Sequence, residues 1–243
     1  MITSLENEKV KNVIKLQKKK YRDLSSTFIV EGEHLVREVY KEGLILELFV
    51  LEDVSVDLNV SYTVVSLDVM KKMSEMDSYP TMIAVCKKME YSNIVGDKIL
   101  LLDDIQDPGN LGTIIRSSVA FSVDTIVLSE QSVDLYNSKV IRATQGMFCH
   151  IPIIRMDLLD AIKKIREKNI PLYGTNVVNG VDVSLLKNEE KKKYCLVMGN
   201  EGNGVKKDIQ MICDKNLYIP MNSKVESLNV GVACSILLYE LGK

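Results

Sequence analysis

The stretch DDIQDPGNLGTIIRSS (103–118), which follows the apolar run ILLL (99–102), decides how the larger part of this chain is read. An apolar run that ends in a loop rich in Pro, Gly and Asn, and then continues as a helical pattern, predicts a strand–loop–helix unit. Pro108 and Gly109 bend the chain, and Gly112 allows close backbone approach. A simple turn needs one or two such residues, so this concentration indicates a functional loop.

The same alternation continues from this stretch to the end of the sequence. It predicts a mostly parallel sheet with helices on both faces, in which ligands bind at the carboxyl ends of the strands. The predicted strands are 98–104, 124–129, 150–154, 171–176, 193–199 and 216–221, and the predicted helices are 111–121, 138–146, 158–168, 205–212 and 227–241.

The N-terminal part predicts a smaller α/β domain. A helix is expected over 5–20, a strand and a helix within 28–43, strands at 47–52, 62–66 and 82–88, and a short helix at 67–76. The segment 89–97 loses the apolar pattern and contains a Gly, which is typical of a linker. The predicted domains are therefore 1–90 and 97–243.

The amino-acid composition argues against a membrane-spanning, a secreted or a metal-binding protein. Hydrophobic residues make up 46% of the 243, enough for a packed core, yet no apolar run approaches the roughly 18–20 residues needed to cross a bilayer. The first residues lack the apolar segment of a signal peptide, so we expect a cytoplasmic protein without membrane contact. Five Cys without a CxxC pair, and only two His, predict buried thiols and no metal site.

The charge is unevenly distributed. Residues 1–22 carry seven basic side chains against two acidic ones, a net charge of +5, whereas the whole chain carries −2. The other residues are therefore acidic on balance. A local basic segment is either a solvated helix face or a contact for phosphate, and phosphate contacts would be sensitive to salt.

A second unusual loop, VMGNEGNGV (197–205), follows a predicted strand. Its glycines are spaced GxxGxG, not the GxGxxG of dinucleotide-binding proteins, and it follows a late strand of the sheet. Val205 stands where a P-loop requires Lys, and Glu201 would repel a phosphate. The loop therefore suits a cationic or hydrogen-bonding ligand, which argues against a dinucleotide-dependent oxidoreductase.

A third loop, IPMNSKVESLNVGVA (219–233), leads from a strand into the last helix. Ser227 and Asn229 lie at the start of that helix, and Asn110 lies near the start of the helix after the first loop. Each of these side chains alone is explained as a helix cap. All three loops follow parallel strands, however, so they should share one edge of the sheet.

Taken together, the three loops resemble the motifs of the SpoU-type RNA 2′-O-ribose methyltransferases of the SPOUT superfamily. The segment VIRATQGMFCHIPI (140–153) is similar to the family's stretch between its first two motifs, and KVKNVIKLQKKKYR (9–22) with FIVEGEHLVREV (28–39) resembles the family's N-terminal RNA substrate-binding domain. The matching motif residues are Asn110, Gly112 and Arg116, then Gly199, Glu201 and Gly204, then Ile219, Pro220, Met221, Ser227, Leu228 and Asn229.

The resemblance implies an α/β fold with a deep trefoil knot, a homodimer, and methyl transfer from S-adenosylmethionine to a ribose 2′-hydroxyl of RNA. Ribosomal RNA is favoured over transfer RNA, and no metal is implied. The implied cofactor-binding residues are Leu128, Gly199, Glu201, Gly204, Ile219, Pro220, Met221 and Leu228, and the implied RNA-binding residues are Lys18, Lys19, Lys20, Arg22 and Glu31.

The implied catalytic residues are Asn110, Arg116, Ser227 and Asn229. Arg116 acts either as a base or as a group that binds phosphate and the nascent alkoxide, and the second role agrees better with a guanidinium that stays protonated. Two other interpretations remain open at this point: a transfer-RNA methyltransferase, and a non-catalytic RNA-binding protein on the same fold. The target RNA and nucleotide are not specified by the sequence.

Overall fold

The computed structural model describes residues 1–177 and 180–243, which divide into two compact units. The N-terminal unit contains 1–89 together with 134–149, and the C-terminal unit contains 90–133 together with 150–243. The segment 134–149 thus packs with the N-terminal unit although it lies within the predicted second domain. The domain boundaries drawn from the sequence stay a prediction.

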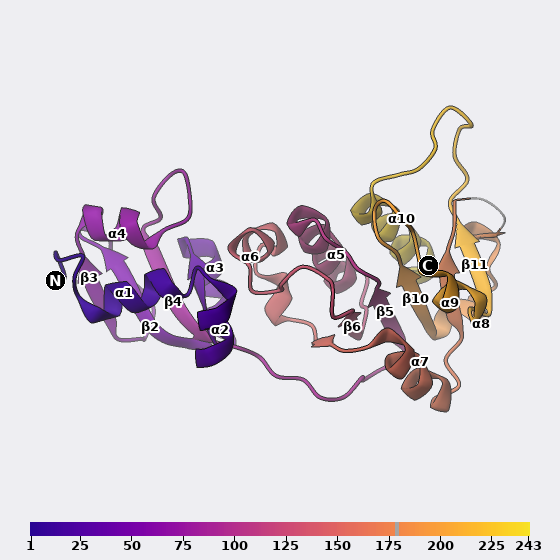
Figure 1. The fold of residues 1–243 in the computed structure, drawn as a ribbon, viewed down its shortest axis with the longest axis horizontal. Coiled ribbons are helices and arrows are strands. Elements are labelled where there is room, and N and C mark those ends of the chain that lie inside the picture. Colours follow the sequence, from indigo (N-terminus) through magenta and orange to yellow (C-terminus); the bar gives the residue numbers. More distant parts are fainter. Residues whose placement is uncertain (178–179) are drawn as a thin grey trace. The chain divides into compact units, whose positions relative to one another are not determined.

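The N-terminal unit is built on a four-stranded sheet with the order β1-β4-β2-β3 (Figure 1). The strands are β1 (Thr27–Glu31), β2 (Ile45–Leu51), β3 (Tyr62–Val65) and β4 (Met82–Lys87). β4 runs antiparallel to both of its neighbours, whereas β2 and β3 are parallel. All four strands were predicted from the sequence.

Helices cover both faces of this sheet. Adjacent residues of a strand point to opposite faces, and Phe28 and Ile29 of β1 follow this rule. Ile29 belongs to the apolar cluster under α1 (Glu8–Lys15) and α4 (Leu67–Met73). The ring of Phe28 meets that of Phe148 at 5.7 Å, on the face covered by α3 (Glu33–Lys41), α6 (Ser138–Thr144) and η1 (Met147–Cys149).

Two helices stand in place of the single helix predicted near the N-terminus. α1 ends at Lys15, and α2 (Lys19–Ser25) follows after a turn. The buried guanidinium of Arg22 donates to the carbonyl oxygens of Leu16 and Gln17 at 2.9 and 2.8 Å, and it forms a 2.6 Å ion pair with Asp134. Arg22 therefore satisfies carbonyl groups that the end of α1 leaves free.

The C-terminal unit contains a seven-stranded sheet in which every pairing is parallel, with the order β7-β6-β5-β10-β8-β11-β9. The two-residue strand β9 was not predicted. The bounds are β5 (Lys98–Leu102), β6 (Thr125–Leu128), β7 (Ile153–Arg155), β8 (Leu172–Thr175), β9 (Val181–Asp182), β10 (Tyr194–Met198) and β11 (Lys215–Tyr218).

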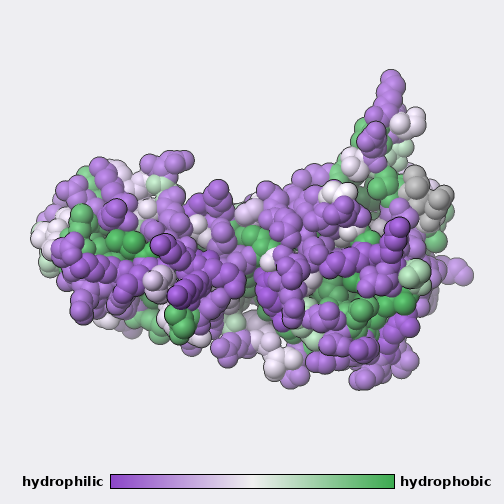
Figure 2. Space-filling view, in the orientation of Figure 1, coloured by the Kyte–Doolittle hydropathy of each residue, from purple (hydrophilic) through white to green (hydrophobic). Residues whose placement is uncertain are grey.

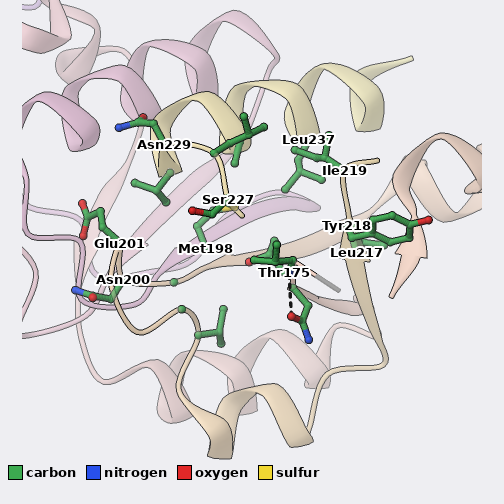
Figure 3. A pocket seen from close by; sticks show the side chains of 18 of the residues that line it. Thr175, Met198, Asn200, Glu201, Leu217, Tyr218, Ile219, Ser227, Asn229 and Leu237 are labelled. Atoms are coloured by element: carbon green, nitrogen blue, oxygen red, sulfur yellow. Dashed lines mark hydrogen bonds between the residues drawn. The ribbon is translucent and has the colours of Figure 1, made fainter. Parts of the chain in front are cut away.

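Helices lie on both faces of the parallel sheet, as predicted. α7 (Leu158–Glu167) and α9 (Lys207–Met211) bury one face, where they meet Leu101 and Val197. On the opposite face α5 (Pro108–Ala120) packs along α10 (Val230–Gly242) (Figures 1 and 3). The shorter η2 (Val183–Leu185) and α8 (Asn188–Lys192) precede β10 and were not predicted.

The connections that follow two neighbouring central strands of the sheet diverge. β5 and β10 are neighbours, but the chain leaves β5 for α5 on one face and β10 for α9 on the other. Connections that diverge at the carboxyl ends of adjacent strands open the space in which α/β sheets bind ligands. The first and second unusual loops of the sequence follow these two strands.

Most apolar side chains are buried in the cores of the two units, and the face of the molecule in Figure 2 is mainly hydrophilic. All five cysteines are free thiols; Cys86, Cys149, Cys195 and Cys234 are buried, as predicted, whereas Cys213 is only partly buried. Within residues 1–177 and 180–243, no helix combines the length and apolar character needed to cross a bilayer.

Candidate active site

A cavity of about 620 Å³ opens at the carboxyl edge of the parallel sheet (Figure 3). Its walls come from the loops after β8, β10 and β11 and from the first turns of α10. This volume is within the range of roughly 300–1,000 Å³ that is usual for small-molecule sites. The second and third unusual loops of the sequence therefore meet at one cavity, as their positions predicted.

The loop after β10 is a tight backbone structure that requires glycine. A Cβ on Gly199 would lie 2.1 Å from backbone atoms of Gly204 and Val205, so no other residue fits there. Asn200 and Gly204 exchange two backbone hydrogen bonds of 3.0 and 2.9 Å, and Gly204 has a φ of +69°. The side chain of Asn200 closes the loop further by accepting from the N–H of Asn203 at 3.1 Å.

Glu201, at the tip of this loop, reaches the start of α5. Its carboxylate accepts a 3.0 Å hydrogen bond from the side-chain amide of Asn110. The backbone N–H groups of Gln106 and Asp107 point at the same carboxylate from 3.5 and 3.4 Å. The positive end of a helix favours a carboxylate at this position. Glu201 thus joins the second loop to the first.

α5 begins earlier than the sequence predicted. Asp107 is its N-cap, accepting from the N–H of Asn110 at 2.8 Å, and Pro108 occupies the first helical position. The side chain of Asn110 is therefore not a cap and is free for other contacts. Its oxygen accepts a 2.8 Å hydrogen bond from the side-chain amide of Asn229.

Asn229 has two functions at the start of α10. Its side-chain oxygen accepts from the N–H groups of Gly231 and Val232 at 3.0 and 3.2 Å, so it is an N-cap, as expected. Its side-chain NH₂ group simultaneously donates to Asn110. Glu201, Asn110 and Asn229 consequently form one hydrogen-bonded chain that links all three loops.

Most of the residues implied as cofactor contacts line the cavity. Leu128 and Pro220 lie outside this lining: Leu128 is buried at the end of β6, and Pro220 is exposed. The lining includes Gly199, Glu201, Gly204, Ile219, Met221 and Leu228, together with Ser227 and Asn229.

Arg116 lies elsewhere on α5. It is exposed, is not part of the cavity lining, and makes no hydrogen bond or ion pair with another residue in the described part of the chain. The structure therefore places Ser227 and Asn229 in the cavity lining, holds Asn110 beside it through Asn229 and Glu201, and leaves Arg116 available at the surface of the same unit. An unpaired surface guanidinium is a suitable contact for a phosphate.

The residues implied in RNA binding fall into two groups. Lys18, Lys19 and Lys20 are exposed, and Lys19 pairs with Asp23. Arg22 and Glu31 are buried and hold internal contacts. Glu31 accepts hydrogen bonds from the side chain of Ser74 and the N–H of Glu75, and Arg22 holds the contacts described above.

One wall of the cavity was not foreseen. The loop after β8 contributes Thr175, Asn176 and Val177. The hydroxyl of Thr175 donates to the carbonyl oxygen of Val197 at 2.9 Å and fixes this loop against β10. The signal was present in the sequence, because PLYGTN (171–176) ends a predicted strand at the same edge with two polar residues.

The chemistry of the cavity suits a ligand with both apolar and cationic parts. Among the described lining residues, Glu201 is the one with a charged side chain, and no Lys or Arg is present to bind a pyrophosphate. Ile219, Leu228 and Leu237 supply apolar surface, and the glycine loop offers backbone polar groups. These features are compatible with an adenine-bearing sulfonium compound.

Fold and cavity together define a parallel α/β protein with a small-molecule site at the carboxyl edge of its sheet. The family model named SpoU rRNA Methylase family matches residues 97–239. The chain belongs to this family, as the motifs predicted. A second model, the MRM3-like substrate binding domain, matches residues 7–84.

Known proteins resemble the chain over nearly its whole length. It is 36% identical over 245 residues to the 23S rRNA (guanosine(2553)-2′-O)-methyltransferase RlmP of Bacillus subtilis, with 99% of this chain and 98% of that protein covered. The AdoMet-bound rRNA methyltransferase of Sinorhizobium meliloti superposes with a TM-score of 0.87 at 29% identity, covering 99% and 96% of the two chains. A solved RNA 2′-O ribose methyltransferase gives 0.84 at 26% identity, covering 99% and 97%.

Proposed function

We propose that this chain transfers a methyl group from S-adenosylmethionine to the 2′-hydroxyl of a ribose in ribosomal RNA. The observation that carries the proposal is the hydrogen-bonded chain of Glu201, Asn110 and Asn229 beside a cavity suited to a cationic cofactor. Family membership supports the methyltransferase class, and the AdoMet-bound rRNA methyltransferase supports the cofactor.

The residues of the cavity fit the cofactor. Ile219, Leu228 and Leu237 would pack against an adenine ring, and backbone groups of the loop 199–205 would hydrogen-bond its polar edges. Glu201 offers the negative charge that complements a sulfonium. S-adenosylmethionine supplies a methyl group that is already activated, so the protein's tasks are to position the ribose and to help its hydroxyl lose a proton.

We assign these tasks to residues around the rim. Ser227 lines the cavity, and Asn229 and Asn110 hold each other in place next to it. Arg116 would bind the phosphate next to the target ribose and stabilise the developing negative charge on the 2′-oxygen. A guanidinium does this without giving up its proton, which is why we prefer this role to that of a base.

The N-terminal unit would hold the RNA. Its match to a substrate-binding domain supports this role. Lys18, Lys19 and Lys20 are the exposed members of the basic segment, and we propose that they contact RNA phosphates. Arg22 and Glu31 are left out of this surface because their side chains are buried and hold contacts within the unit.

We propose 23S rRNA as the substrate, with the guanosine named for the Bacillus subtilis relative as the first nucleotide to examine. Methyl transfer from labelled cofactor should be measured on 23S rRNA, 16S rRNA and transfer RNA from cells that lack the enzyme. Labelling of 23S rRNA at this guanosine supports the proposal. Labelling of transfer RNA would favour the alternative substrate, and binding without labelling would favour a non-catalytic RNA-binding protein.

We further propose a homodimer that uses α10. Two large apolar residues of this helix, Val232 and Tyr239, are 46% and 52% exposed. A helix that is apolar on all sides is normally covered on all sides. Light scattering should give twice the chain mass, and Tyr239→Glu should shift it to one chain. We also retain the deep trefoil knot and a cytoplasmic location, where ribosomal RNA is found, as parts of this proposal.

A further inference from the structure

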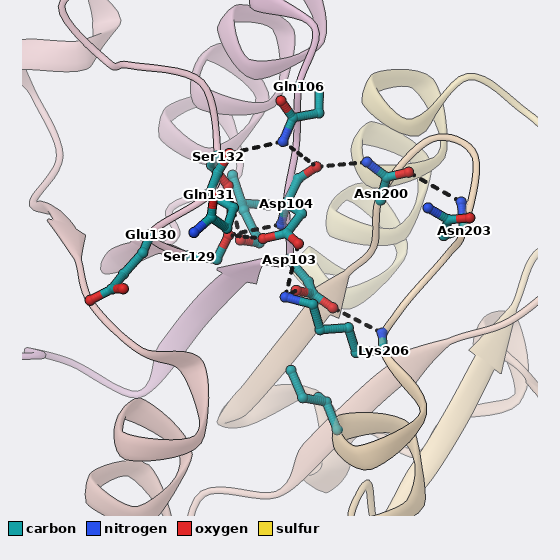
Figure 4. Close-up of polar contacts among 12 residues, drawn as sticks. Asp103, Asp104, Gln106, Ser129, Glu130, Gln131, Ser132, Asn200, Asn203 and Lys206 are labelled. Carbon is teal, nitrogen blue, oxygen red and sulfur yellow. Dashed lines mark hydrogen bonds and ion pairs between the residues drawn. The ribbon is translucent and has the colours of Figure 1, made fainter.

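Two consecutive carboxylates, Asp103 and Asp104, follow β5 directly and lie outside the cofactor cavity (Figure 4). The side chain of Asp103 is only 1% exposed. Asp104 has a φ of +57°, in the left-handed region that Asp and Asn tolerate better than most other residues. A buried carboxylate is stable only when hydrogen bonds or an opposite charge compensate for its loss of water.

Both carboxylates converge on Lys206. The ammonium group of Lys206 lies 3.1 Å from Oδ1 of Asp103 and 2.8 Å from Oδ2 of Asp104. Oδ2 of Asp103 also accepts from the backbone N–H of Lys206 at 2.9 Å. The hydroxyl of Ser129 donates to the other oxygen of Asp104 at 2.7 Å. This cluster fixes the backbone of Lys206 as well as its side chain.

The same pair of residues also holds the beginning of the glycine loop. The carbonyl oxygen of Asp104 accepts a 2.8 Å hydrogen bond from the side-chain amide of Asn200. Asn200 is at the beginning of the loop and Lys206 is at its end, so Asp103 and Asp104 together contact both ends of the loop. Between these ends lie Glu201, Gly202 and Gly204, which line the cofactor cavity.

We propose that Lys206, together with Asp103 and Asp104, is a positioning device that sets the shape of the cofactor-binding loop and thereby the affinity for S-adenosylmethionine. This inference rests on the proposed cofactor and adds residues outside the three motifs. Without Lys206, the buried carboxylate of Asp103 faces Asp104 with no cation between them. The two charges then repel, and the end of the loop loses its anchor.

The electrostatics agree with this geometry. Burial raises the pKa of Asp104, but hydrogen bonds from Lys206 and Ser129 outweigh that effect and leave the pKa below its ordinary value. The hydrogen bond to Asp104 correspondingly raises the pKa of Lys206. Asp104 and Lys206 therefore stabilise each other's charged form.

The test compares three single variants by calorimetric titration with S-adenosylmethionine and with S-adenosylhomocysteine. Lys206→Met keeps an unbranched side chain of similar length and should weaken both ligands about tenfold, or ~1.4 kcal/mol. Equal losses for both ligands indicate loop shape, because direct charge effects would act on the sulfonium alone. Lys206→Arg should bind within about threefold of the wild type, and the matched control, Lys207→Met, changes an exposed neighbour and should leave both affinities unchanged.

Steady-state kinetics distinguish a role in positioning the cofactor loop from a general loss of folded structure. Lys206→Met should raise the KM for the cofactor about tenfold while kcat at saturating cofactor stays within about threefold. Asp104→Asn keeps both the left-handed backbone and an acceptor for Ser129 but removes a charge. It should also raise the KM for the cofactor with little change in kcat, and it serves as the test if Lys206→Met fails to fold. The double variant Asp103→Asn/Lys206→Met should lose less affinity than the sum of its single changes.

Wild-type cofactor affinity in both Lys206→Met and Asp104→Asn would overturn the inference, as would an equal loss in Lys207→Met. Failure of the proposed function looks different. In that case the wild-type protein itself would bind no S-adenosylmethionine, or would bind it without methylating any RNA.

Discussion

The side-chain amide of Asn229 donates a 2.8 Å hydrogen bond to the side-chain oxygen of Asn110, across 119 residues of sequence. This bond joins the first turn of α10 to the first turn of α5, and Asn110 passes the connection on to Glu201 at 3.0 Å. The orientation of each amide is thereby fixed: the oxygen of Asn110 faces Asn229, and its NH₂ group faces Glu201.

Substitutions at Asn229 should separate capping from catalysis. Asn229→Ala loses the N-cap and should destabilise the protein by about 1 kcal/mol, in addition to reducing methyl transfer. Asn229→Asp keeps a good cap but sets an acceptor against the oxygen of Asn110, so it should lose less stability than Asn229→Ala and still lose about tenfold in kcat. Urea unfolding and single-turnover transfer measure the two effects. Undiminished transfer by Asn229→Asp would show that the bond to Asn110 is not used.

Arg116→Ala should abolish methyl transfer and leave cofactor binding intact. Arg116 does not line the cavity, so the dissociation constant for S-adenosylmethionine should be unchanged. Loss of a group that stabilises developing charge typically costs about 10²–10³ in kcat. Arg116→Lys keeps the charge without the planar fork and should recover part of the rate. Transfer by Arg116→Ala at the wild-type rate would remove this side chain from the mechanism.

Gly199→Ala should disrupt the cofactor loop. The new Cβ would meet backbone atoms of Gly204 and Val205 at 2.1 Å, which costs about 1–3 kcal/mol or forces the loop to move. Gly202→Ala is the matched control in the same loop, because its Cβ would meet only the side chain of Asn200 at 3.6 Å. Thermal unfolding and cofactor titration should distinguish the two variants. Similar behaviour of both would mean that the loop is looser than its contacts indicate.

Neutralising Lys18, Lys19 and Lys20 with Gln should weaken RNA binding and flatten its dependence on salt. Each lost phosphate contact removes about 0.9 from the slope of log K against log salt for a duplex, and about 0.7 for a single strand. The control is the other run of three lysines, 191–193, in and after α8 of the C-terminal unit. Binding measured by filter retention at several salt concentrations should change for the first set only. An equal effect of both sets would indicate general attraction without a defined surface.

Asp23 should stabilise the N-terminal unit in a pH-dependent manner. Hydrogen bonds from Lys19 and Lys88 lower its pKa from 3.8 to about 2. Because the pKa is depressed in the folded state, the stabilisation is complete above pH 3.8 and is lost as the pH falls towards 2. The side chain is half exposed, so the contribution stays below about 1 kcal/mol. In urea unfolding, Asp23→Asn should be less stable than the wild type at pH 6, and the difference should disappear as the pH falls below 2.

Much of the fold followed from the sequence because alternating strands and helices can bury their apolar residues in few ways. The failures have identifiable causes. The break between α1 and α2 depends on Arg22, which caps the free carbonyl groups only because Asp134, far away in sequence, holds it in place. β9, with two residues, carries too little pattern to be recognised.

For the site, the shared edge of parallel strands was enough to predict that loops around Gly199 and Asn229 would meet. The role of Asn110 was harder to foresee. Asp107 is the N-cap of α5, so the side-chain amide of Asn110 is free for other contacts. Which of the two residues caps the helix depends on the residue at which the helix begins. Asp103, Asp104 and Lys206 were missed because charged residues beside a strand are ordinarily solvated, and only their convergence in space reveals their function.

The placement of the segment 134–149 has an evolutionary consequence. The chain passes between the two units three times, near residues 89, 133 and 149. Phe148 of this segment is buried against Phe28 of the N-terminal unit. Deleting the first 90 residues would therefore expose the apolar surface of the segment 134–149 and would not leave an intact catalytic unit. A descendant that lost or exchanged residues 1–89 would need substitutions in the segment 134–149 at the same time. The two regions should therefore evolve together.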